Sequence, residues 1–205
     1  MTPRRTDGAP TFTEQARRRQ LVECTIDLIS EKGLAAASLS AIAERAGLSK
    51  AAVLYHFTSK DNLTQAAFAH VLDAFTAYVA ERVAERGDDP RAAVVAYVHA
   101  MIGYQRDHRR HVRVITETLL DDHAGTRFRA PGQHDVGGRR QGLAELLEAG
   151  QQAGRFREFD VKAVALVIGG AIDGVVAHWL ADPDFDLTAA ARETEAFVLR
   201  AIAAD

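Results

Sequence analysis

Three histidines in the middle of the chain raise the question of metal binding or acid–base catalysis. His108 and His111 stand three residues apart, and His123 follows two aspartates. Such groups can hold a transition metal or transfer a proton. The first two histidines lie among arginines whose positive charge disfavours a bound cation: Arg106, Arg109, Arg110 and Arg113. Because the sequence also lacks an HExxH motif, a glycine-rich phosphate loop and a nucleophile elbow, we expect no enzyme, metal or cofactor.

Positive charge gathers near the start of the chain. The 205 residues have a net charge of −3, yet positions 1–60 hold nine lysines and arginines against six acidic residues. A basic end on an acidic body is expected when only that end meets a phosphate backbone. The apolar runs are too short to span a bilayer, and no secretory signal is recognisable. We therefore expect a cytoplasmic protein without a membrane partner.

Apolar residues recur at helical spacing along nearly the whole chain, and no segment alternates as a half-buried strand would. The sequence predicts an all-α fold of about nine helices, at 13–32, 39–46, 50–57, 60–86, 90–106, 110–120, 136–152, 161–180 and 188–203. Residues 121–139 fit either a mobile loop or a frayed helix start. The expected domains are a disordered arm (1–11), a helix-turn-helix domain (12–60) and a helical body (61–205).

The second and third expected helices have the features of a helix-turn-helix. Ala43 and Ala46 are small enough for the two helices to cross closely, and Gly47 supplies the positive φ of the turn. Val53 and Phe57 can anchor the later helix to its support. The side chains left to point outward are then Lys50, Tyr55 and His56. Tyr55 and His56 could instead pack against the first helix.

The stretch from Ser38 to Leu63, SLSAIAERAGLSKAAVLYHFTSKDNL, resembles the DNA-binding signature of the TetR family of transcriptional regulators. The resemblance covers about residues 13–65, and the number and lengths of the later helices fit the same family. It implies a homodimer that binds a palindromic double-stranded DNA operator. It also implies that a small-molecule effector, bound in the body, releases the operator.

The resemblance assigns roles to individual residues. Ser38 matches a capping residue that touches a phosphate, and Lys60 matches a phosphate contact at the start of the long helix. Many members have Gly in place of Ala51 and Tyr in place of Leu54, so Tyr55 is expected to take the aromatic contact, and the operator sequence stays open. The expected DNA-binding residues are Ser38, Ser49, Lys50, Ala51, Tyr55, His56 and Lys60.

The body is expected to bind the effector with an apolar and aromatic pocket that has few polar groups. The expected ligand-binding residues are Tyr97, Met101, Tyr104, Ile115, Leu119, Phe128, Leu143, Asp173 and Trp179. Any of the apolar ones could be plain core. Asp173 and His178 are polar residues within an apolar helix, so each is expected to meet the ligand or to bond across the dimer.

The expected dimer interface uses the same apolar helix, where Gly169, Gly170 and Gly174 permit close approach, together with the last helix around Phe197 and Ile202. A core role is the alternative for the glycines. Two other functions stay open: an enzyme, and a helical DNA-binding or interaction module without ligand sensing. Such a module would show no operator preference and no large pocket.

Overall fold

The computed structural model describes residues 11–121, 136–182 and 184–204. Nine α-helices and one short 3-10 helix form this part of the chain, and a single isolated β-bridge is its one extended pairing, so the all-α prediction is confirmed. The elements are α1 (Phe12–Lys32), η1 (Leu34–Ala36), α2 (Leu39–Ala46), α3 (Lys50–His56), α4 (Lys60–Ala84), α5 (Pro90–Asp107), α6 (Arg109–Asp121), α7 (Val136–Gln152), α8 (Val161–Ala181) and α9 (Leu187–Ile202). The predicted arm, except its last residue, and most of 121–139 lie outside the described residues.

The described residues divide into two compact units. One contains residues 11–70 and 113–121, and the other contains residues 71–112 and 136–204. The helices α4 and α6 therefore each contribute residues to both units. The domain boundary predicted between residues 60 and 61 falls at the first turn of α4. In the structure the first segment of unit one continues along α4 to residue 70.

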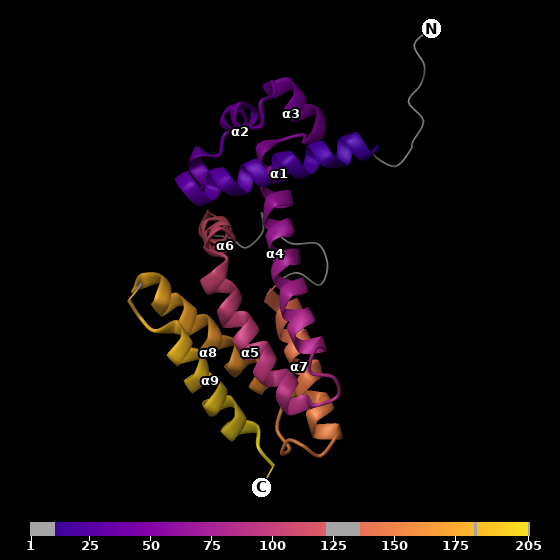
Figure 1. Ribbon diagram of the computed structural model, residues 1–205, viewed down its shortest axis with the longest axis vertical. Helices are drawn as coiled ribbons and strands as arrows, with labels where there is room; N and C mark the ends of the chain where they lie inside the picture. The colour runs from indigo at the N-terminus through magenta and orange to yellow at the C-terminus, as the bar shows by residue number, and fades with distance from the viewer. Residues whose placement is uncertain (1–10, 122–135, 183, 205) are drawn as a thin grey trace. The chain divides into compact units, whose positions relative to one another are not determined.

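Local sequence signals set the ends of the first three helices, which lie together in Figure 1. The hydroxyl oxygen of Ser38 accepts a hydrogen bond from the backbone N–H of Ala41 (3.2 Å), as an N-cap does. Gly47 ends α2 with φ 65° and ψ 35°, the left-handed conformation that a residue with a Cβ adopts at a cost. Ser49 caps α3 in the same way, through the N–H of Ala52. The predicted helix-turn-helix is confirmed.

The core of the first unit forms where α1 meets the helix pair. Ile26, Ile42 and Val53, one from each helix, are fully buried, and Phe57 is 1% exposed. Burial of each such side chain stabilises the folded state by on the order of 1.5 to 3 kcal/mol. Val53 and Phe57 are thus the buried residues that anchor α3, as expected.

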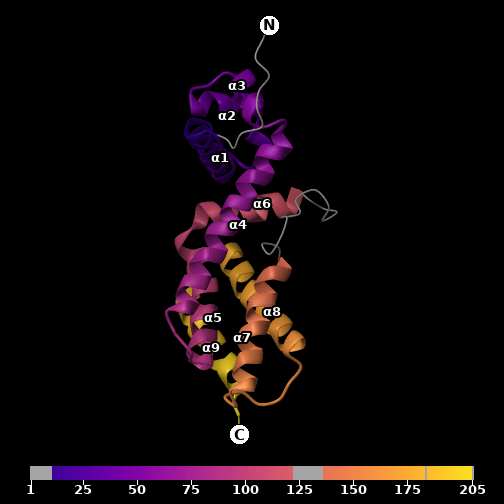
Figure 2. The same ribbon diagram turned by 90° about the vertical axis from the view of Figure 1, so that its right-hand side faces the viewer.

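In the second unit, α5 packs against α7, α8 and α9, and α8 packs against both α7 and α9 (Figure 2). Asp89 caps α5 and Pro90 is its first residue, as predicted. The ring of Phe156 lies against the backbone of α7 at Gly150. A Cβ on Gly150 would lie 2.0 Å from that ring, so only glycine permits the contact.

The helix α8 is long and apolar enough to cross a membrane by length and composition alone, which is weak evidence for a span. One side of it packs on the protomer through Ile168, Ile172 and Val176. The opposite side is exposed and contains Leu166 and Val167. This exposed apolar side is where a further protein surface would be expected.

Candidate DNA interface and ligand cavity

The start of α3 presents small and basic residues to solvent. Ser49, Lys50 and Ala51 are all exposed, and the side chain of Ser49 caps the helix as described above. Ser38 is exposed at the start of α2. These four predicted residues therefore lie where another molecule can reach them.

The end of α3 carries Tyr55 and His56 in different environments. Tyr55 is 60% exposed, and its hydroxyl donates to Glu14 Oε1 at 3.3 Å, so α1 helps to orient the ring. His56 is half-buried, with its ring edge-on to Tyr55. Tyr55 thus touches α1 at its hydroxyl while most of its ring stays exposed.

Two polar side chains of α1, which the sequence analysis did not select, hold the ends of α2 and α3. The guanidinium of Arg18 donates to the carbonyl oxygen of His56 and lies over the ring of Phe57, 4.1 Å from its centroid. Gln20 Nε2 donates to the carbonyl oxygen of Ala46 (3.1 Å). Helix ends leave carbonyls without intrahelical partners, so both contacts stabilise the helix pair in place. No local pattern reveals partners 38 and 26 residues away.

Lys60, the first residue of α4, has a partner within the chain. Its Nζ donates to the carbonyl oxygen of Leu34 at 2.9 Å, and its side chain is half-buried. The N–H of Leu34 donates to Glu117 Oε2 on α6 at 3.2 Å. Both backbone groups of Leu34, in the turn between α1 and α2, are thus held by side chains from distant helices. The ammonium has three donors, so this bond leaves it able to meet a phosphate as well.

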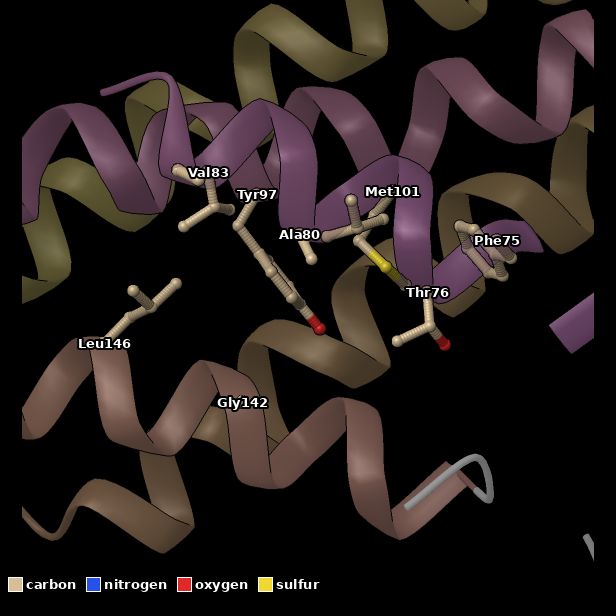
Figure 3. Close-up of a pocket in the computed structure, with 10 residues that line it drawn as sticks. Phe75, Thr76, Ala80, Val83, Tyr97, Met101, Gly142 and Leu146 are labelled. Carbon is tan, nitrogen blue, oxygen red and sulfur yellow. The ribbon is translucent and has the colours of Figure 1, made fainter. Parts of the chain in front are cut away.

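An apolar cavity of about 290 Å³ lies in the second unit between α4, α5 and α7 (Figure 3). Its lining comprises Phe75, Thr76, Val79, Ala80, Val83, Ala84, Tyr97, Met101, Gly142 and Leu146. Small residues on facing helices leave the space, since Ala80 and Ala84 belong to α4 and Gly142 to α7. Of the predicted ligand-binding residues, Tyr97 and Met101 lie on this lining.

The other predicted ligand-binding residues have separate positions. Leu143 is fully buried, and Trp179 is buried beneath the guanidinium of Arg109, 4.6 Å from a ring centroid. Ile115 is half-buried and Leu119 is 48% exposed, both in the first unit. Asp173 is exposed on α8. Phe128 lies outside the described residues.

Tyr104 is packed into an aromatic cluster rather than facing the cavity. Its ring stacks between Phe75 (4.6 Å between centroids) and His108 (4.0 Å), and its hydroxyl forms a 2.6 Å hydrogen bond with His111 Nδ1. Burial raises the pKa of Tyr104 to about 12. The two histidines considered for metal binding are thus engaged with a tyrosine, and His123 lies outside the described residues.

The sequence does not single out the lining residues on α4 as part of a cavity. Phe75, Val79 and Val83 repeat at helical spacing, which indicates burial but not what lies opposite. Gly142 and Leu146 lie about 60 residues later, and only the packing of α7 brings them to the same cavity.

Two family models together match nearly the whole chain. Residues 21–67 match the model described as bacterial regulatory proteins, tetR family. Residues 68–201 match the model of the C-terminal region of YsiA-like proteins. The chain belongs to the TetR family. The helix-turn-helix of this TetR-family protein is the part that the first model describes.

Curated relatives match this TetR-family protein over part of its length. It is 41% identical over 85 residues to the regulator BetI of Stenotrophomonas maltophilia, which is 42% of this chain and 43% of that protein. It is 38% identical over 86 residues to BetI of Burkholderia thailandensis. The match therefore spans less than half the length of these relatives.

Solved structures share the fold of both units. A transcriptional regulator from Saccharomonospora viridis, in complex with choline, aligns with a TM-score of 0.80 and 22% identity, covering 93% of this chain and all of that one. The fatty acid degradation regulator FadR from Bacillus halodurans aligns with a TM-score of 0.75 and 21% identity, covering 95% and 97%. At these identities the likeness concerns the fold alone.

Proposed function

We propose that this TetR-family protein is a cytoplasmic, sequence-specific DNA-binding regulator, acting as a repressor that a small-molecule effector releases from a palindromic operator. The observation that carries the proposal is α3, anchored by Val53 and Phe57 and presenting its polar side to solvent. A helix supported in this way can enter the major groove.

Two kinds of DNA contact follow from where the residues lie. Exposed hydroxyl and ammonium groups suit phosphate oxygens, which fix position without reading sequence. Exposed methyl and aromatic groups on α3 suit base edges. We assign the phosphate contacts to Ser38, Ser49, Lys50 and Lys60, and the base contacts to Ala51, Tyr55 and His56.

The exposed side of α8 supports a homodimer. Leu166, Val167 and Leu180 are each about half exposed there, and Phe197 on α9 is 59% exposed. A Cβ on Gly170 or Gly174 would meet nothing within 4 Å, so these glycines lie on the open surface and have no core role in the protomer. Ile202 is buried within its own protomer and does not belong to the exposed face.

The cavity between α4, α5 and α7 supports ligand sensing over the alternative of a module that senses nothing. The helix α4 begins with Lys60 and continues to the cavity residues Phe75, Val79 and Val83. One helix therefore carries a DNA-contact candidate and part of the ligand cavity. An effector that favours a different position of α4 would shift the population away from the DNA-binding form.

The test is selection of genomic DNA fragments by the purified protein at near-physiological salt, followed by sequencing. We expect one palindrome to be enriched, with half-sites about one helical turn apart. A matched selection with Tyr55→Ala, which should relax base preference by about 1–3 kcal/mol, is expected to enrich a degenerate set. Absence of any enriched sequence with the wild-type protein at every salt concentration would refute the proposed regulator.

A further inference from the structure

The chemistry of the cavity lining restricts what the effector can be, if the proposed regulatory function holds. All ten lining residues that the structure describes are uncharged, and eight of them offer only carbon, sulfur or hydrogen to a ligand: Phe75, Val79, Ala80, Val83, Ala84, Met101, Gly142 and Leu146. The nearly continuous apolar wall is suited to a ligand body that leaves water by the hydrophobic effect.

The two hydroxyl-bearing residues of the lining are Thr76 on α4 and Tyr97 on α5. Figure 3 shows the Tyr97 ring extending between α4 and α7, with its hydroxyl oxygen at the tip. Hydroxyl groups can both donate and accept, so they suit a neutral alcohol, ketone or ester. A charged head group would meet no countercharge on the described lining, and burying an unpaired charge is costly.

A quaternary ammonium group, such as the choline in the structurally similar regulator from Saccharomonospora viridis, requires the faces of several aromatic rings or a carboxylate. The described lining offers two rings, Phe75 and Tyr97. One face of Phe75 is already covered by the stacked ring of Tyr104, 4.6 Å away. The described part of the wall therefore differs from an aromatic cage, and it contains no carboxylate.

The size of the cavity completes the description of the ligand. A volume of about 290 Å³ lies near the lower limit of ligand pockets in proteins. We propose that the effector is a small, uncharged, mainly apolar molecule, with one hydrogen-bonding group that meets the hydroxyl of Tyr97 or of Thr76.

Three probes with the same ten-carbon chain test the charge preference: 1-decanol, decanoate and decyltrimethylammonium, with binding measured directly by calorimetry below their micellar concentrations. We expect 1-decanol to bind at least tenfold more tightly than either ion, because only the neutral head group avoids an unpaired buried charge. Equal or tighter binding of decanoate or decyltrimethylammonium would overturn the proposal.

A substitution of Gly142 tests whether the ligand binds in this cavity. A Cβ there meets nothing within 4 Å, so the side chain of Gly142→Leu starts in open space on the cavity lining, and leucine is the better helix former. We expect it to weaken 1-decanol binding at least tenfold. The matched control is Ala149→Leu, which adds a larger side chain at an exposed position of α7 outside the lining and should bind as the wild type does. Unchanged binding by Gly142→Leu would refute this site.

Operator binding is measured separately, by fluorescence anisotropy with the selected palindrome. It distinguishes failure of the proposed regulatory function from failure of the proposed ligand class. Tight operator binding without 1-decanol binding would leave the regulator standing and overturn the ligand class. Binding of 1-decanol without an enriched palindrome would support the ligand class and overturn the proposed regulator. With both in place, we expect 1-decanol to release the wild type from DNA but not Gly142→Leu.

Discussion

At the scale of single residues, Lys60 shows how one side chain can join a structural and a functional role. Its ammonium bonds the carbonyl oxygen of Leu34 and stands at the first turn of α4. A phosphate placed there would accept a second hydrogen bond from the same group. The assignment therefore requires a measurement that separates a phosphate contact from a stabilising one.

The salt dependence of DNA binding provides that separation. We expect Lys60→Ala to weaken binding to all DNA sequences and to reduce the slope of log K against log salt by about one, because one counterion fewer is released. Lys162→Ala removes one exposed lysine from the other unit and should leave the slope unchanged. A slope in Lys60→Ala equal to that of the wild type would remove this residue from the DNA interface.

Tyr104 gives a residue-scale prediction about pH. Burial raises its pKa from the ordinary value near 10 to about 12, so the unfolded chain loses this proton first as pH rises. Between pH 10 and 12 the unfolded state binds fewer protons than the folded one, and the free energy of unfolding must fall.

Between pH 9 and pH 11 we expect the wild type to lose about 1 kcal/mol more than Tyr104→Phe. At neutral pH the variant should be less stable by about 1 kcal/mol, because the bond to His111 is lost. Urea unfolding of both proteins at pH 9 and pH 11 measures the difference. Equal decreases in the free energy of unfolding of the two proteins would contradict the raised pKa of Tyr104.

At the scale of elements, the turn between α1 and α2 depends on helices that follow much later in the chain. Glu117 on α6 accepts from the N–H of Leu34, and its carboxylate lies 3.1 Å from where a Cβ on Gly33 would be. Gly33 has φ 82°, which also favours glycine. The sequence marks Gly33 as a helix end. It does not reveal that Glu117 on α6, 83 residues after Leu34, holds the turn.

Two substitutions at position 117 test this contact. Glu117→Ala removes the acceptor and should cost about 1 kcal/mol, or a decrease of roughly 2–4 °C in the thermal midpoint. Glu117→Gln keeps a carbonyl oxygen that can accept from the same N–H, so it should retain most of the stability. Thermal unfolding followed by circular dichroism measures both, and equal midpoints for Glu117→Ala and the wild type would show that the bond contributes nothing.

At the scale of the whole molecule, we propose that copies of the chain associate through the exposed apolar side of α8 and α9. Leu166, Val167 and Phe197 are each more than half exposed in the protomer. Association through such a face would fix the spacing of two copies of α3, as operators with two half-sites require.

We expect Val167→Glu to shift the protein from dimer to monomer, because the association would bury an unpaired carboxylate. Operator affinity should decrease in parallel, since a monomer contacts one half-site only. Ala77→Glu, at an exposed position of α4, is the matched control and should remain dimeric. Analytical ultracentrifugation measures both variants, and a Val167→Glu dimer as stable as the wild type would place the interface elsewhere.

The sequence by itself determined the helices, their ends and the helix-turn-helix. Ser38, Gly47 and the Asp89–Pro90 pair act on backbone within a few residues, so their effect can be predicted without knowing the rest of the fold. The family resemblance rests on the same local positions, and family models match residues 21–201.

Only the tertiary structure decided which buried residues face empty space. Tyr97, Met101 and Tyr104 lie on the same side of α5 at helical spacing, yet the first two line the cavity and the third fills an aromatic cluster. The difference depends on which residues of other helices lie opposite: Gly142 on α7 leaves room, whereas Phe75 stacks on Tyr104. Helical periodicity records burial along one helix, but a cavity is a property of several helices packed together.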